Sequence, residues 1–426
     1  MVIAKTQKPE SSYDVAIIGG GPAGMMAAIN ASNLGASVLL VEKNDSLGKK
    51  LLITGKGRCN LTNAEFNHRE FVKQFGKNGD FLLSGFSIFG SKETIDFFEK
   101  LGVRTKIERG KRVFPESDRA QDILSALSSA LKKNQVQIIT GKKVKDIVLE
   151  KKNIKYLLLE DDTKIFAKNF ILTTGGLTYP LLGSTGDGYG FSEKLGHKII
   201  APKPALVPIA IEETWPKHLQ GLTLKNINLT VFQDSKKVDS RFGEMLFTHF
   251  GISGPIVLDL SKKIGAYLEK GVVTLILDLK PALDFAKLDK RIQRDFEKYK
   301  NKQFKNALSD LLPQKLIETI IYFSGIDLNK TISNITREER HKLVKMLKNL
   351  RMTPVKLLDF DEAIITTGGI DLKEIDSKTM RSKLIGNLFF AGEIIDLDGP
   401  TGGFNLQLCW TTGFVAGKNA ATNYKL

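Results

Sequence analysis

The strongest constraint on the fold is the stretch from Asp14 to Glu42, DVAIIGGGPAGMMAAINASNLGASVLLVE. It opens with an apolar, β-branched run typical of a buried strand, and a second apolar run, 38–41, follows a small-residue helical pattern. Gly19, Gly21 and Gly24 separate the first strand from the helix. These glycines would allow a tight turn, close approach of the backbone to a pyrophosphate, and close helix–strand packing. The order of elements predicts a dinucleotide-binding site.

Both ends of this motif offer groups that suit a nucleotide. The helix that begins near Pro22 and Ala23 presents N–H groups and a partial positive charge to phosphates. Glu42, at the end of the second strand, can accept hydrogen bonds from ribose hydroxyls, and Lys43 follows it. A purely structural glycine turn is the alternative, and the complete order of strand, glycines, helix, strand and acid argues against it.

A second loop of unusual chemistry follows, with the sequence GKKLLITGKGRCNLTN. Its glycines remove side-chain bulk, its cations suit phosphate, and its Asn and Thr side chains can hydrogen-bond a polar heterocycle such as a flavin. We expect it to be a second clamp on the cofactor, with a glycine-rich connector as the alternative. The expected contact residues are Gly48, Lys49, Lys50, Gly57, Arg58, Cys59, Asn60, Thr62 and Asn63.

This loop resembles the signature loop of the BaiN/YhiN-like family of FAD-dependent oxidoreductases, which includes proteins described as aminoacetone oxidases. Similar segments occur at Arg112–Pro115, 173–188, 247–255 and 366–403, so the resemblance covers nearly the whole chain. It implies an α/β fold with an FAD-binding, two-dinucleotide-type Rossmann domain, in which a parallel sheet is joined to a β-meander. It also implies that the backbone of Val144 lies beside the adenine.

The middle of this predicted domain carries the meander and a further glycine turn. Strand-like runs at 144–149, 154–160 and 164–167 predict the meander, and a buried strand at 170–174 ends at two glycines. We expect Thr174, Gly175 and Gly176 beside the cofactor, with a plain turn as the alternative. Asp187, between glycines, could cap a helix as well as contact the cofactor. The resemblance makes Tyr179 a candidate side chain facing the substrate, although a packing role is more typical.

Residues 198–350 have a different character and predict an insertion in the FAD-binding domain, which we assign to 13–197 and 351–426. Residues 198–283 are strand-like and predict a β-barrel-like domain, and 284–350 predict a helical one. The insertion would cover the flavin ring and shape the substrate pocket. His249, in the turn THFGISGP, is the second substrate-side candidate, with a structural role in the turn favoured. No spaced His, Cys and carboxylate set predicts a metal site.

The last 70 residues predict a second strand–glycine–helix unit that returns to the first domain. A buried strand, 388–391, ends at Gly392, and two more glycines precede the last helix. Such a helix start offers donors and positive potential to the flavin pyrimidine edge, where reduction develops negative charge. A terminal packing helix is the alternative. The expected contact residues here are Gly392, Glu393, Asp396, Gly402, Gly403, Phe404, Asn405 and Leu406.

FAD is favoured over NAD because this second segment exists and no other GxGxxG follows a strand. Any NAD(P)H would therefore visit the substrate pocket transiently. Two redox directions stay open: oxidation of a small molecule such as an amine, aminoacetone included, with dioxygen or another acceptor, and reduction of an alkene-type bond. The cysteines, Cys59 and Cys409, are too far apart for a CxxC motif, which argues against a flavin–disulfide mechanism.

The formal net charge of +16 raises a different class of function, a flavin-containing RNA-binding or tRNA-modifying protein. The lysines are scattered, however, with no long basic run and no stripe of interleaved aromatic residues. A solvated basic surface is therefore favoured over a nucleic-acid face. No apolar run reaches membrane-spanning length and no signal-peptide pattern is present, so we expect a cytoplasmic protein without membrane association.

Overall fold

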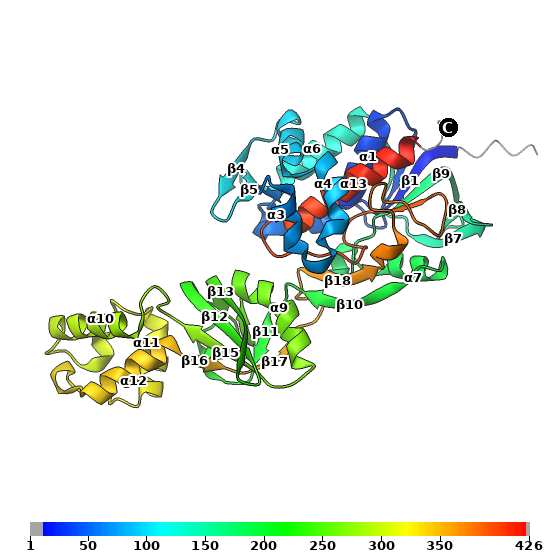
Figure 1. The fold of residues 1–426 in the computed structure, drawn as a ribbon. Helices are drawn as coiled ribbons and strands as arrows, with labels where there is room; N and C mark the ends of the chain where they lie inside the picture. Colours follow the sequence, from blue (N-terminus) through cyan, green and yellow to red (C-terminus); the bar gives the residue numbers. More distant parts are fainter. Residues whose placement is uncertain (1–11, 423–426) are drawn as a thin grey trace, which may run out of the picture. The chain divides into compact units, whose positions relative to one another are not determined.

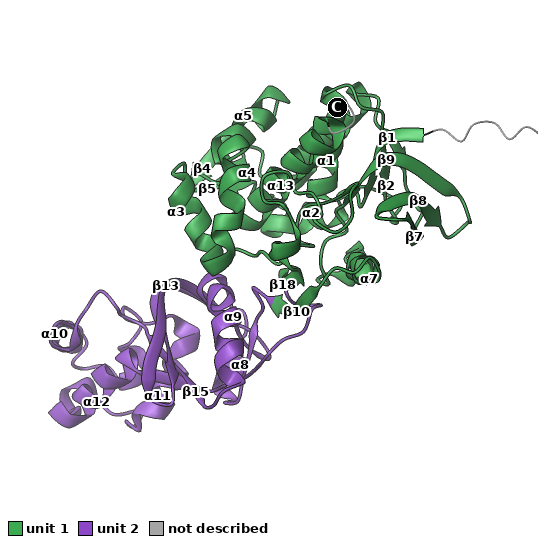
Figure 2. Cartoon of the chain, turned by 45° about the vertical axis from the view of Figure 1, so that its right-hand side comes forward, with its two compact units in different colours: residues 1–204, 364–426 green, residues 205–363 purple. Residues whose placement is uncertain are grey.

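The computed structural model describes residues 12–422, which form two compact units. Unit 1 comprises residues 12–204 and 364–422, and unit 2 comprises residues 205–363 (Figure 2). Unit 2 is therefore an insertion in the chain of unit 1. The three-part division predicted from the sequence, with boundaries at 198, 284 and 351, stays a prediction.

A seven-stranded sheet lies at the centre of unit 1 (Figure 1). Five of its strands are parallel, in the pairs β6–β2, β2–β1, β1–β9 and β9–β19, and the antiparallel strands β8 and β7 continue it as a meander. The predicted α/β class with a parallel sheet and a β-meander is thus confirmed. The bounds are β1 (Ser12–Ile18), β2 (Val38–Val41), β6 (Gln137–Ile139), β7 (Val144–Glu150), β8 (Asn153–Leu159), β9 (Lys164–Leu172) and β19 (Leu388–Phe390).

Strand β9 joins the two halves of this sheet. The sequence pattern predicts two separate runs here, but the structure has one continuous strand. Ile165 at its start pairs with β8 of the meander, and Phe170–Leu172 at its end pair with β1 and β19. Residues 170–172 pair in parallel with a strand on each side, so they lie at the centre of the sheet. One continuous strand connects the meander to this central position.

Alternate residues of the central strands divide between two hydrophobic cores. Val15 and Ile17 of β1 face one core, and Ala16 and Ile18 face the other. This alternation follows from the pleat of a strand. The first core contains helices α1 (Pro22–Asn33), α6 (Ala120–Lys133) and α13 (Phe404–Thr422), and the second contains the inner side chains of the meander.

Helices α1 and α13 lie side by side although they come from opposite ends of the chain (Figures 1 and 2). Gly413 and Gly417 of α13 face α1 so closely that a Cβ at either position would overlap the backbone of Ala23 or Ala27. Small residues at the crossing therefore bring the two helices together. This contact places the C-terminal helix against the first strand–helix motif.

The remaining elements of unit 1 surround this framework. Strands β3 (Thr62–Asn63), β4 (Thr105–Glu108) and β5 (Arg112–Pro115) form a small sheet, and β10 (Ile199–Ala205) pairs with β18 (Ile365–Ile370). The other helices are α2 (Lys49–Ile53), α3 (His68–Val72), α4 (Leu83–Ile88), α5 (Ser91–Lys100) and α7 (Asp187–Lys194). Short 3-10 segments lie at Thr54–Gly57, Lys73–Leu82, Pro180–Leu182 and Leu372–Glu374.

Unit 2 contains an antiparallel sheet in the order β16-β15-β12-β13-β14-β11-β17. The two strands at the ends of this order follow each other directly in the chain. Leu350–Met352 pairs with β15, and Pro354–Leu357 pairs with β11. The sheet is therefore closed by residues 350–357, as a barrel is. The strands are β11 (Ile209–Ile211), β12 (Thr223–Gln233), β13 (Lys236–Phe247), β14 (Gly251–Ser253), β15 (Val273–Asp278), β16 (Leu350–Met352) and β17 (Pro354–Leu357).

Helices accompany this sheet in unit 2. They are α8 (Trp215–His218), α9 (Pro255–Leu268), α10 (Phe285–Lys298), α11 (Gln314–Ser324) and α12 (Arg337–Lys348), with 3-10 segments at Phe304–Asn306 and Ile332–Asn334. One hydrophobic core includes side chains of the strands, such as Leu229 and Leu275, together with Ile292, Ile320 and Leu347 of the last three helices. The strand-rich and helical segments of the insertion therefore share a core.

Candidate FAD-binding site

The glycines of the turn after β1 are needed for two different reasons: some for packing within the protein, and one to leave space at the start of α1. Gly19 has φ of 107°, and a Cβ there would lie 2.6 Å from the carbonyl oxygen of Thr173. A Cβ at Gly24 would overlap the carbonyl of Gly19, so both positions need glycine for packing within the protein. At Gly21, by contrast, a Cβ would meet no atom within 4 Å. Gly21 thus faces open space at the start of α1, where a pyrophosphate would lie.

The carboxylate of Glu42 is held in place at the end of β2. Glu42 is buried, and its two oxygens accept hydrogen bonds from the backbone N–H groups of Gly20, at 2.7 Å, and Asn44, at 2.8 Å. Each oxygen keeps a second lone pair for another donor. The turn itself therefore orients the carboxylate that we predict to bind the ribose.

A cavity lies at the carboxyl ends of β1 and β2, and it brings together six residues predicted from the sequence. They are Gly19, Glu42, Lys43, Val144, Thr174 and Asp187. Thr174 Oγ1 is buried and has no hydrogen-bond partner among the described residues. An unpartnered hydroxyl at this position is consistent with a bound group that completes its hydrogen bonding.

An ion pair crosses one side of this cavity. Lys43 Nζ lies 2.7 Å from Asp187 Oδ2, and Lys143 lies 3.7 Å from the other carboxylate oxygen. Burial alone would raise the pKa of Asp187, but the hydrogen bonds from Lys43 and Thr185 and the charges of Lys43 and Lys143 together outweigh it and hold the pKa below its usual value. Sequence reasoning missed Lys142, Lys143 and Phe191 in the cavity lining, because isolated surface lysines and a helical Phe carry no motif.

A second polar cluster joins four distant segments of unit 1. Lys50 Nζ lies 2.6 Å from Thr178 Oγ1 and 2.8 Å from Glu393 Oε2. The other oxygen of Glu393 accepts a hydrogen bond from the backbone N–H of Thr366, at 2.8 Å. Gly176 packs against this cluster, because a Cβ there would overlap the Thr366 side chain. Thr178 and Thr366 were not predicted as site residues, and single threonines give no sequence signal.

The signature loop packs against the start of α13. Asn63 Nδ2 donates to the carbonyl of Gly402 at 3.1 Å, and Thr62 Oγ1 donates to Gln407 Oε1 at 2.6 Å. Asn60, with its side-chain oxygen toward Gly403, accepts from the Gly403 backbone N–H at 3.0 Å. The loop near the N-terminus of the chain thus contacts the glycine-opened helix at its C-terminus.

Some predicted contact residues have protein partners of their own. Arg58 Nε donates to Asp118 at 2.8 Å and its guanidinium lies 4.0 Å from the Phe114 ring centroid, while Lys49 pairs with Asp45 at 2.9 Å. Hydrogen bonds to Glu108 and then Asp118 raise the pKa of Arg58 further. Burial raises the pKa of the Cys59 thiol to about 12, so it is a neutral, inert group.

The remaining predicted residues are placed by packing and by backbone conformation. Gly48, Gly57, Gly175 and Gly392 all have positive φ, and a Cβ at Gly392 would lie 2.8 Å from the Cβ of Ala23. The other four lie around the start of α13. Asn78 donates to Asp396, Asn405 donates to the carbonyl of Gly399, the Phe404 ring packs 4.8 Å from Phe71, and Leu406 packs on the first core. Their contacts with a cofactor stay predictions.

The two substrate-side candidates lie in different units. Tyr179 is half-buried in unit 1 with φ of 56°, and Lys50 Nζ lies 5.9 Å from its ring centroid. Burial raises the pKa of the Tyr179 hydroxyl, which favours its protonated form. His249 is exposed in unit 2, in the turn between β13 and β14, where its ring packs 4.8 Å from Phe250. Both roles stay predictions.

Two further findings hold for residues 12–422. No group of three or more His, Cys, Asp or Glu side chains in this range could hold a metal ion. Within the same range, no helix has the length and apolar character needed to cross a membrane.

The open face of Gly21, the oriented Glu42 carboxylate and the unpartnered Thr174 hydroxyl fit the pyrophosphate and adenosine parts of FAD. Fold and site together define a flavoprotein of the FAD-binding Rossmann class. The family model for the HI0933-like protein Rossmann domain matches residues 13–419. The chain belongs to this family, and it is an FAD-dependent oxidoreductase.

Two curated relatives match over almost their full length. The chain is 31% identical to the 3-dehydro-bile acid delta(4,6)-reductase of Clostridium scindens, over 96% of this chain and 98% of that protein. It is also 31% identical to the ribosomal RNA dihydrouridine synthase of Haemophilus influenzae, over 93% of this chain and 96% of that protein.

A solved structure shares the fold. The 3-ketosteroid-delta4-(5alpha)-dehydrogenase of Rhodococcus jostii, in complex with 4-androstene-3,17-dione, superposes with a TM-score of 0.55 at 17% identity, covering 98% of each chain.

Proposed function

We propose that this oxidoreductase reduces a carbon–carbon double bond that is conjugated to a carbonyl group. One observation carries the proposal: the names of two full-length relatives, which act on unlike molecules, describe reduction of the same kind of bond. A delta(4,6)-reductase of a 3-dehydro bile acid saturates an enone or dienone, and a dihydrouridine synthase saturates the C5–C6 bond of uracil. This likeness favours the reductive direction over the oxidation of an amine.

The reaction needs a hydride at the β-carbon of the substrate and a proton at the α-carbon, with both electrons drawn from an external reductant such as NAD(P)H. FAD, once bound and reduced by that donor, would supply the hydride. The start of α13, opened by Gly402 and Gly403, contributes a positive partial charge that favours a negatively charged flavin. The Lys50–Glu393 pair bridges the signature loop and the turn after β19 beside this region. These groups bind and orient the cofactor.

Two kinds of substrate contain such a conjugated bond: a small apolar enone and a uracil base in RNA. The net charge of +16 would attract a polyanion such as RNA, although the lysines are scattered along the sequence. The small enone is favoured by the bile-acid reductase among the relatives. The chemistry at the flavin is the same for both substrates, so one assay run with each of them distinguishes the two.

The test is reoxidation of the reduced flavin under anaerobic conditions. The protein is reduced with NADPH or dithionite, and a 3-keto-4-ene steroid, uridine or a single-stranded RNA fragment is added. We expect return of the visible flavin band with the steroid, the RNA or both, and no return with the saturated steroid. A gain of two hydrogens in the product, read by mass spectrometry, identifies the substrate. Reduction of the oxidised flavin by aminoacetone, without reoxidation by any conjugated substrate, would overturn the proposal.

A further inference from the structure

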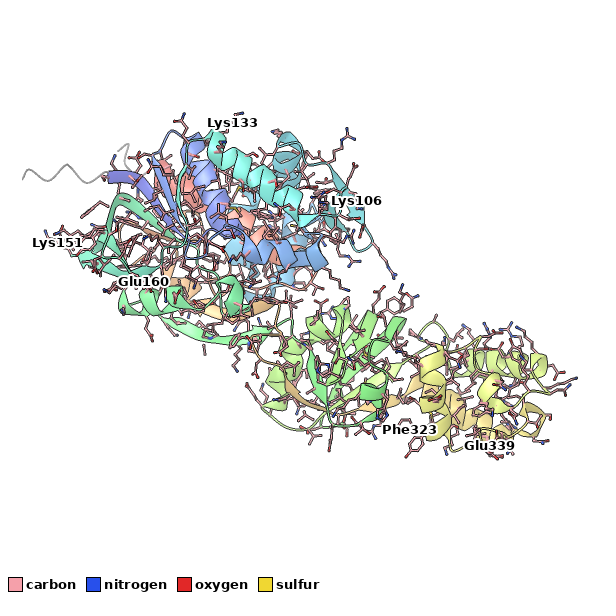
Figure 3. The ribbon with its side chains drawn as sticks, turned by 180° about the vertical axis from the view of Figure 1, so that it is seen from behind. Lys106, Lys133, Lys151, Glu160, Phe323 and Glu339 are labelled. Carbon is pink, nitrogen blue, oxygen red and sulfur yellow. The ribbon has the colours of Figure 1, made fainter. Side chains whose placement is uncertain are left out.

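An exposed aromatic surface lies in unit 2, where α8 meets α11. Tyr322 is 79% exposed and Phe323 is 37% exposed, and their rings lie 5.3 Å apart. Phe323 also contacts Trp215 of α8 edge to face, at 6.0 Å. We call Trp215, Tyr322 and Phe323 the aromatic platform. Figure 3 places Phe323 at the outer edge of unit 2.

The platform is fixed to the core of unit 2 and is not part of that core. Trp215 packs 5.7 Å from the ring of the buried Phe247. Helix α11 already buries Leu316, Ile317, Ile320 and Ile321 on its inner face. Tyr322 and Phe323 therefore add little to the inner packing of the helix, and both keep aromatic surface that a ligand can reach.

Three lysines lie on the helices of the platform or close to the end of α11: one on α8, one on α11, and one on α12 near Gly325. Lys217 is exposed on α8, and Lys315 of α11 donates to the carbonyl of Gln220 at 3.3 Å. Lys342 Nζ lies 3.2 Å from the position that a Cβ at Gly325 would take, directly after α11. Among the described residues, none of these three lysines forms an ion pair with a carboxylate. Glu318 is the acidic residue of α11, and it is exposed.

Three other basic residues of the same unit are paired. Lys298 lies 2.7 Å from Asp310, Lys330 lies 2.7 Å from Glu339, and Arg340 lies 2.7 Å from Asp289. Exposed aromatic faces combined with unneutralised cations match the requirements of single-stranded nucleic acid, whose bases stack and whose phosphates attract lysine.

We propose that the aromatic platform, with Lys217, Lys315 and Lys342, binds single-stranded RNA. Unpaired bases stack on Tyr322 and Phe323, and the lysines contact the flanking phosphates. A second copy of the chain is the less favourable occupant, because the same unpaired lysines would face one another. The inference rests on the RNA arm of the proposed function, and it assigns a recognition surface distinct from the residues predicted to bind FAD.

The test measures binding of a fluorescently labelled, uridine-rich single-stranded RNA to the FAD-loaded full chain by anisotropy. The double substitution Tyr322→Ala, Phe323→Ala should raise Kd about tenfold or more, since stacking on an aromatic residue is worth about 1–3 kcal/mol per base. Lys315→Gln with Lys342→Gln should raise Kd and flatten the salt dependence by about 0.7 in log–log slope for each phosphate that the protein no longer neutralises. Tyr322→Phe should preserve most of the affinity because it keeps the ring.

Matched controls lie in the same unit. Phe285→Ala removes an aromatic ring that is 51% exposed on α10, and Lys290→Gln removes an exposed lysine of that helix. Both controls should leave Kd unchanged. Equal losses of affinity in platform and control variants, no binding by the parent protein, or a change of oligomeric state without a change of Kd would each overturn the inference.

The outcome is separable from that of the proposed function. Reoxidation of the reduced flavin by a free steroid enone should be the same in the parent and in the platform variants, because these residues contact RNA alone. If the enone is reduced and RNA does not bind, the inference fails and the function stands. If RNA binds at the platform and no conjugated bond is reduced, the recognition surface stands and the proposed function fails.

Discussion

Lys50 Nζ lies 2.8 Å from Glu393 Oε2, although 343 residues separate the two in the sequence. The side chains are 20% and 17% exposed, so the pair is largely withdrawn from water. It ties the signature loop to the turn after β19. This contact brings the two ends of the chain together beside the residues predicted to bind the flavin.

Breaking this pair should weaken both the fold and FAD binding. Lys50→Met leaves the Glu393 carboxylate partly buried without its cation, which we expect to cost roughly 2 kcal/mol of unfolding free energy. Thermal unfolding and the bound FAD fraction measure the two effects. The matched control is Lys92→Met, which removes the exposed Lys92–Asp96 pair and should change neither. An unchanged FAD fraction in Lys50→Met would remove Lys50 from the cofactor site.

Substitutions at two glycines of the turn should have opposite consequences. Gly21→Val should fold, since its side chain enters space that the protein leaves open, but it should lose the yellow colour because the side chain occupies the pyrophosphate position. Gly24→Val should fail to fold because its Cβ overlaps the Gly19 carbonyl. Circular dichroism and the visible spectrum separate the two results. A yellow, FAD-loaded Gly21→Val protein would contradict the placement of the site.

His197 predicts a pH dependence of stability. It is buried, with Nδ1 3.2 Å from Glu374 Oε2 and Nε2 2.9 Å from Ser382 Oγ. Burial lowers the pKa of His197 in the folded state, against the opposing effect of Glu374. Between the folded pKa and the unfolded pKa of about 6.5, only the unfolded chain is protonated, so the unfolding free energy falls as pH is lowered through this window.

Chemical denaturation at a series of pH values measures this effect. His197→Gln should remove much of the slope, and His218→Gln, at an exposed position, should leave it intact. A slope of the opposite sign in the parent protein would show that Glu374 dominates and that the imidazole is charged in the folded state.

Both thiols should be unreactive in the folded protein. Cys59 and Cys409 are buried, and burial raises the pKa of each to about 12. A thiol-specific reagent at pH 8 should label neither residue until denaturant is added, when both should react. Rapid labelling of one cysteine in the native protein would show that its segment opens readily.

Some of this architecture could be predicted from local pattern alone. The apolar run 15–18, the glycines at 19, 21 and 24, and Glu42 are local features, and they were sufficient to predict a dinucleotide-binding Rossmann domain, now confirmed. The prediction of FAD, also confirmed, needed in addition the second strand–glycine–helix unit near the C-terminus. The β-meander was predicted from alternation and turn residues. The continuous course of β9 was not, since its length depends on β1 and β19, which come from distant parts of the chain.

The partners of individual side chains could not be predicted in the same way. Arginine commonly binds phosphate, so Arg58 was predicted to contact the cofactor. In the structure its guanidinium pairs with Glu108 and Asp118 instead. The buried set of His197, Glu374 and Ser382 gave no signal, because its members lie 177 and 185 residues apart. Their proximity depends on the pairing of β10 with β18, which no local pattern specifies.

By itself the amino-acid sequence determined the class of fold, and its two separate strand–glycine–helix units indicated the cofactor. These features depend on strand and helix periodicity and on glycines at fixed spacing, all of which act within about thirty residues. Only the tertiary structure decided that Lys50 meets Glu393, that residues 350–357 close the sheet of unit 2, and that Tyr322 and Phe323 stay exposed at the end of α11. Such contacts follow from the packing of distant segments, whose energies are set by shape and burial over the whole unit.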